Sequence, residues 1–111
     1  MNTKSVPLTS ADTGLSAAAR DFSVRDRVVI ITGAGQGIGR ELARQFTAAG
    51  AIAVIADLSL QNATSVATEI SVAGGRALAL AVDVSKKDSV DAMVAATLKE
   101  FGRIDIWINN A

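Results

Sequence analysis

The chain has 111 residues, of which half are apolar and 20% are charged, and its 11 basic residues balance its 11 acidic residues. This length holds one small domain, and the balanced charge argues against a nucleic-acid partner or an anionic membrane surface. Cys and His are both absent, which excludes disulfides, thiolate nucleophiles, imidazole bases and nearly all zinc or transition-metal sites.

Residues 1–25 are rich in Ser, Thr and Ala and show no hydrophobic periodicity. We interpret them as a flexible extension that precedes a domain over residues 26–111. The longest apolar run in the extension, Ala17–Ala19, is far too short for a signal-peptide core or a membrane span. A cytoplasmic location is therefore the default expectation.

The most informative segment begins with the apolar run Val28–Ile31, which predicts a strand buried on both faces. The run leads directly into four glycines at alternate positions and then into a predicted helix over residues 37–49. Glycines permit a sharp turn and let backbone amides approach a ligand closely, and the start of a helix favours an anion. The segment therefore predicts a phosphate-binding loop with the sequence Gly33-Ala34-Gly35-Gln36-Gly37-Ile38-Gly39.

Downstream of this loop, strand-like and helix-like segments alternate. Ser59 is expected to cap the second helix, and Ser85 with Asp88 resembles a capping box that starts the third helix, which runs to Phe101. Further strands are predicted over residues 51–56, 78–82 and 104–108, and the second helix over residues 60–73.

Helical spacing predicts one buried apolar face on each helix. The predicted faces are Ile38, Leu42, Phe46 and Ala49 on the first helix, Ala63, Val66, Ala67 and Ile70 on the second, and Val90, Met93, Val94, Leu98 and Phe101 on the third.

Four strands joined by three helices predict an α/β fold with right-handed crossovers and a parallel sheet. Winding three strands in one direction and placing the fourth beside the first gives a Rossmann-like, doubly wound sheet of order 3-2-1-4. The fold is expected to be incomplete, without the later strands of such sheets. The ligand crevice is predicted at the carboxyl ends of the first and fourth strands.

Two carboxylates follow predicted strands at that edge. Asp57 lies 18 residues after Gly39, near the offset of about 20 at which an acid accepts hydrogen bonds from the adenosine ribose. Asp83 is positioned to accept from an adenine amino group. For each carboxylate the alternative interpretation is a helix cap.

Three motifs together resemble the N-terminal half of the short-chain dehydrogenases and reductases: the glycine loop after Thr32, Asp83-Val84, and Asn109-Asn110-Ala111. The resemblance covers about residues 22–111. It implies that Gly33 to Gln36 and Ile38 line the phosphates and adenosine of a nicotinamide cofactor. It also implies that Asp83-Val84 holds adenine, that Asn110-Ala111 approaches the inner ribose, and that Thr32 and Asn109 tie the first strand to the fourth.

The family catalyses hydride transfer with a Tyr acid/base and supporting Lys, Ser and Asn residues beyond the Asn-Asn-Ala motif. The chain contains no Tyr, so no catalytic residue can be assigned. We therefore expect a truncated cofactor-binding half that is inactive alone. The resemblance implies hydride transfer to or from a small carbonyl or alcohol substrate in the complete protein, which would be a homo-oligomer.

NAD is the predicted cofactor in preference to NADP, because Asp57 would repel a 2′-phosphate and Gln36 offers it no positive charge. Two alternatives stay open: a non-catalytic dinucleotide-binding module and an S-adenosylmethionine-dependent methyltransferase. The methyltransferase is disfavoured because residues 28–32 contain no acidic residue.

Overall fold

In the computed structural model, which describes residues 23–111, four parallel strands form one sheet of order β3-β2-β1-β4. The predicted α/β class and strand order are confirmed. The extension predicted over residues 1–25 lies outside the described residues as far as residue 22. The elements are β1 (Val28–Thr32), α2 (Gly37–Ala48), β2 (Ile52–Asp57), α3 (Leu60–Val72), β3 (Arg76–Ala81), α4 (Lys87–Phe101) and β4 (Ile106–Ile108).

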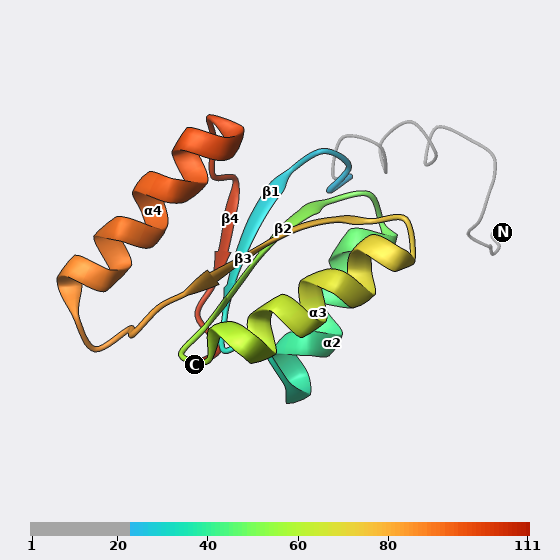
Figure 1. The fold of residues 1–111 in the computed structure, drawn as a ribbon. Helices are drawn as coiled ribbons and strands as arrows, with labels where there is room; N and C mark the ends of the chain where they lie inside the picture. The colour runs from blue at the N-terminus through green and yellow to red at the C-terminus, as the bar shows by residue number, and fades with distance from the viewer. Residues whose placement is uncertain (1–22) are drawn as a thin grey trace, which may run out of the picture.

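Strand β1 is the centre of the sheet and of the core. It pairs with β2 on one side and β4 on the other, so that Ile30 lies opposite both Val54 and Trp107. Helices α2 and α3 cover one face of the sheet and α4 covers the other (Figure 1). Since successive side chains point to opposite faces, Val29 and Ile31 pack toward α2 and α3, and Val28 and Ile30 toward α4. Every residue of β1 is buried, which explains the uninterrupted apolar run Val28–Ile31.

Strand β4 begins two residues later than predicted, and the cause is Asp105. Its carboxylate Oδ2 accepts the backbone N–H of Val28 at 2.8 Å, and its own N–H donates to the Val28 carbonyl at 2.9 Å. A side chain thus takes the place of a backbone partner at the entry to the strand. Strand β3 begins two residues earlier and ends one residue earlier than predicted, and β2 is shifted by one residue. The ends of β1, α2 and α3 each differ from prediction by one residue.

The predicted buried face of α2 is wrong in part. Ile38 is 75% exposed, Ala49 is exposed, and the fully buried positions are Gly39, Ala43 and Thr47. These small residues let α2 lie close to the sheet. The larger Leu42 and Phe46 pack at the flank of the core.

Helix α4 keeps most of its predicted apolar face, since Met93 is buried and Val90 and Phe101 pack against the core. Its buried residues are Met93 and Thr97, whose hydroxyl donates to the Met93 carbonyl at 2.8 Å, whereas Leu98 is 44% exposed. The predicted capping box is wrong, because Lys86 is the N-cap residue and makes no side-chain capping bond. Ser85 bonds instead to Asp83. The predicted face of α3 is confirmed, with Ala63, Val66 and Ile70 buried.

Between residues 23 and 111, no helix combines the length and the apolar character needed to cross a membrane.

Candidate functional site

The segments that follow the four strands meet at one edge of the sheet and form a cleft of about 220 Å³. Parallel strands deliver their carboxyl ends to the same edge, which is where open α/β sheets bind ligands. The structure therefore brings together five residues predicted from separate motifs. The full lining is Gly33, Asp57, Leu58, Val82, Asp83, Val84 and Ala111.

Gly33 and Gly39 bring β1, α2 and the chain after β4 into close contact. Gly33 has a φ of +64°, and a Cβ there would lie 3.0 Å from the Ala111 Cα. A Cβ on Gly39 would collide with the Gly33 carbonyl oxygen and lie 2.7 Å from the Asn110 Nδ2. The same Nδ2 donates to the Gly33 carbonyl at 3.3 Å. Packing is enough to require glycine at position 39, and at position 33 the left-handed backbone adds to the close contact.

Gly35 brings the loop against the end of β2. A Cβ on Gly35 would lie 2.7 Å from the Asp57 Oδ2 and 2.7 Å from the Asn62 Cβ. Asn62 could not be identified from the sequence, because an exposed Asn in the first turn of a helix carries no signal of its own.

The first turn of α2 presents backbone amides that its N-cap residue leaves unpaired. Gln36 has an extended backbone and makes no side-chain capping bond, and the first N–H groups of a helix have no partner within the helix. Ala34 differs from its neighbours, since its N–H donates to the Ala56 carbonyl at 3.2 Å and the residue is buried. Gln36, Gly37 and Ile38 are exposed on the loop and do not line the cleft.

Asp57 is half-buried at the end of β2, and the capping alternative does not hold for it. Helix α3 is capped by Ser59, whose Oγ accepts the Asn62 N–H at 3.1 Å. Among residues 23–111 the Asp57 carboxylate receives no hydrogen bond. It is therefore free to accept from a ligand at the cleft.

Asp83 already serves the local backbone. Its Oδ1 accepts from the Ser85 hydroxyl at 2.6 Å and from the Ser85 N–H at 3.0 Å. The hydroxyl bond, followed by the backbone bond, holds the pKa of Asp83 below its usual range, so the group is ionised at neutral pH. Its Oδ2 accepts nothing from the described part of the chain.

A buried hydroxyl fixes the segment after β4, and the predicted tie between β1 and β4 is confirmed. Thr32 Oγ1 donates to Asn109 Oδ1 at 3.0 Å and accepts the N–H groups of Asn110 and Ala111 at 3.0 and 3.2 Å. Thr32 is fully buried. Asn110 and Ala111 are thereby held beside Gly33.

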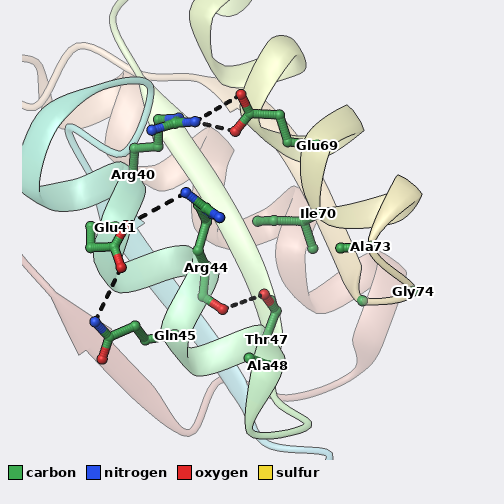
Figure 2. A pocket seen from close by; sticks show the side chains of 11 residues that line it. Arg40, Glu41, Arg44, Gln45, Thr47, Ala48, Glu69, Ile70, Ala73 and Gly74 are labelled. Carbon is green, nitrogen blue, oxygen red and sulfur yellow. Dashed lines mark hydrogen bonds and ion pairs between the residues drawn. The ribbon is translucent and has the colours of Figure 1, made fainter.

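A larger hollow of about 660 Å³ lies between α2 and α3 (Figure 2). Its charged side chains are paired with one another: Arg40 donates two bonds to Glu69, at 2.9 and 3.0 Å, and Arg44 lies 3.7 Å from Glu41. The bond to Glu69 raises the pKa of Arg40 above its ordinary value. None of the predicted site residues lines this hollow, so we place the candidate site at the smaller cleft. Residues 23–111 also contain no group of acidic or other ligating side chains suited to a metal ion.

Comparison with known proteins identifies the family of the chain. Residues 27–111 match the family described as short chain dehydrogenase. The chain is 46% identical over 91 residues to short chain dehydrogenase/reductase astE of Aspergillus oryzae, covering 81% of this chain and 35% of that protein. It is 44% identical over 86 residues to meso-2,3-butanediol dehydrogenase of Serratia marcescens, covering 78% and 34%.

Among solved structures, the hydroxysteroid dehydrogenase of Escherichia coli superposes with a TM-score of 0.80 at 35% identity, over 84% of this chain and 40% of that one. The chain thus spans about a third of the length of the curated relatives it matches.

Proposed function

The chain belongs to the short chain dehydrogenase family, and we propose that it is the dinucleotide-binding part of an NAD(P)-dependent oxidoreductase. The observation that carries the proposal is the convergence at one sheet edge of a glycine loop, the amides that open α2 and the Asp57 carboxylate. Amides and the positive end of a helix favour a pyrophosphate, and a carboxylate accepts ribose hydroxyl groups.

The residues fit such a cofactor in chemistry, and the loop leaves open space beside Gly37. No Cβ fills the loop at Gly33, Gly35, Gly37 or Gly39, and a Cβ at Gly37 would meet nothing within 4 Å. Gly33, Gly35 and Gln36, with Ile38, would line the phosphates and adenosine, whereas the buried Ala34 would only hold the loop in place. Asp83 and Val84 would hold the adenine, and Asn110 and Ala111 would approach the inner ribose. When bound, the nicotinamide accepts or delivers the hydride.

We propose NAD rather than NADP as the preferred cofactor. The half-buried Asp57 carboxylate receives no hydrogen bond from residues 23–111, and no base at position 36 offsets it. A 2′-phosphate placed a few ångströms from this charge would cost about 1 to 4 kcal/mol.

The test is calorimetric titration of the protein that carries this chain with both cofactors. NAD should bind at least about fivefold more tightly than NADP, and Asp57→Ala should narrow the difference. Asp91→Ala, which removes an exposed carboxylate on α4, should leave the ratio unchanged. Equal or tighter binding of NADP by the unmodified protein would contradict the assignment.

The proposed substrates are small alcohols or carbonyl compounds, because the relatives named above are dehydrogenases of a butanediol and of hydroxysteroids. The family match removes the methyltransferase alternative. The non-catalytic binding module remains as the second candidate, since the chain matches only about a third of the length of each of these curated relatives. We propose that these 111 residues alone transfer no hydride, because they contain no Tyr for the acid/base role. We also propose that the active protein is a cytoplasmic homo-oligomer.

A hydride-transfer assay on the protein that carries this chain separates the two candidates. Turnover of an alcohol with NAD supports the enzyme, and tight NAD binding without turnover of any alcohol or carbonyl compound supports the binding module.

A further inference from the structure

Asn62, in the first turn of α3, lies near the carboxylate of Asp57, which we propose binds the adenosine ribose. The Asn62 Cβ and the Asp57 Oδ2 each lie 2.7 Å from the point where a Gly35 Cβ would stand. The two atoms are therefore no farther apart than twice that distance. Asn62 does not line the cleft itself and adjoins it through Asp57.

The backbone of Asn62 is fixed while its carboxamide is not engaged. The Asn62 N–H donates to Ser59 Oγ at 3.1 Å, which anchors the residue in the capped first turn. In the described part of the chain its side-chain amide makes no hydrogen bond, and the residue is exposed. A carboxamide offers two donors and one acceptor, so it can pair with a ribose hydroxyl, with Asp57, or with both.

We propose that Asn62 is a further specificity-determining residue, which presents a neutral carboxamide beside Asp57 to the 2′ position of the adenosine ribose. This inference rests on the proposed function and adds a residue to its site. Asp57 alone supplies the charge that disfavours a 2′-phosphate, and the residue at position 62 sets how strongly that charge acts. Placing a charge at position 62 should therefore change the preference between the two cofactors in a direction set by its sign.

The experiment is titration of the protein that carries this chain with NAD and with NADP, for the unmodified protein, Asn62→Lys and Asn62→Asp. Asn62→Lys should reduce the ratio of the NADP Kd to the NAD Kd by about tenfold, and Asn62→Asp should increase it several-fold. Thr68→Lys is the matched control, because it adds the same charge to an exposed position of α3 about 9 Å farther along the helix. It should leave the ratio within about twofold of the unmodified value.

Ratios within about twofold of the unmodified value in both Asn62 variants, with NAD still bound by the unmodified protein, would overturn the inference and leave the proposed function standing. Equal weakening of both cofactors would also overturn it, because that is the signature of a structural role. Binding of neither dinucleotide by the unmodified protein would overturn the proposed function, and the inference with it. Circular dichroism checks that each variant is folded, and the near-isosteric Asn62→Asp decides the matter if the lysine variant does not fold.

Discussion

Asp105 is the residue with the most structural consequence that the sequence did not reveal. Its side chain is 12% exposed, and it accepts both from the Val28 N–H at 2.8 Å and from Arg103 at 2.7 Å. A single acidic residue before an apolar strand has the same appearance as any solvated turn residue. Its role depends on β1 and β4 being neighbours, which is a property of the folded sheet.

We expect Asp105→Ala to lower the free energy of unfolding by about 1 to 3 kcal/mol at pH 7, because it leaves the buried Val28 N–H without its partner. The bond from Arg103, then that from Val28, lowers the pKa of Asp105. A carboxyl whose pKa is depressed by folding stabilises the fold above its unfolded value of about 3.9, and that contribution is lost as the pH falls through the folded value. The difference in the free energy of unfolding between the unmodified protein and Asp105→Ala should therefore shrink below about pH 4. Urea denaturation across pH 3 to 7 measures it.

Asp91→Ala is the matched control for this experiment. Asp91 pairs with Lys87 at 2.6 Å on the exposed surface of α4, and exposed pairs contribute less than about 1 kcal/mol. The role given to Asp105 would be contradicted if Asp105→Ala lost no more stability than the control. It would also be contradicted if the stability difference from the unmodified protein did not depend on pH.

At the scale of elements, helix α2 is held against β1 by a contact that only glycine permits. A Cβ on Gly39 would collide with the Gly33 carbonyl oxygen. The Gly39→Ala substitution must therefore push α2 away from the glycine loop that precedes it. We expect this variant to lose at least about tenfold in NAD affinity and about 1 to 3 kcal/mol of stability, the usual cost of overpacking.

Gly74→Ala separates strain from position. Unlike Gly39, Gly74 has a left-handed φ, of +91°, but a Cβ there would meet nothing within 4 Å, and the residue lies just after α3, away from the cleft. This control should lose stability without losing NAD affinity. An equal loss of affinity in both variants would indicate that the loop geometry is not what binds the cofactor.

The sequence predicted the existence and order of these elements because hydrophobic periodicity reports burial directly. The predicted face of α2 was wrong in part because a periodicity argument assigns large apolar side chains to the buried face. The close approach of α2 to the sheet instead requires small residues, and Gly39, Ala43 and Thr47 are the buried ones. The predicted start of α4 was wrong because the Asp83 carboxylate, two residues before Ser85, takes the Ser85 hydroxyl and N–H.

At the scale of the whole molecule, the strand order followed from the alternation of elements and the handedness of crossovers, and the order in turn placed the cleft. The Thr32 contacts agree with the resemblance to the family. Asn62 could not be predicted, since its proximity to Gly35 joins segments that only the folded sheet brings together.

Within residues 23–111 the sheet has two edge strands, β3 and β4, and the outer side of β4 is unpaired because β1 is its only neighbour. Trp107 on β4 is 43% exposed. An exposed apolar edge strand recruits other chains, so we expect the 111-residue chain expressed alone to self-associate. Trp107→Lys should shift it toward monomer in size-exclusion chromatography with light scattering.

Val72→Lys is the matched control for the edge, because Val72 is an 84% exposed apolar residue on α3. It should not change the distribution of species. A monodisperse monomer for the unmodified chain at high concentration would show that the β4 edge does not drive association.

The most direct test of the central claim, that a nicotinamide dinucleotide binds where the four strands end, is amide hydrogen exchange of the protein that carries this chain with and without saturating NAD. We predict added protection in residues 33–39, 57–58 and 83–84, and none in residues 44–48 and 69–75, which line the larger hollow between α2 and α3. Protection confined to that hollow, or an unchanged glycine loop at saturation, would contradict the claim.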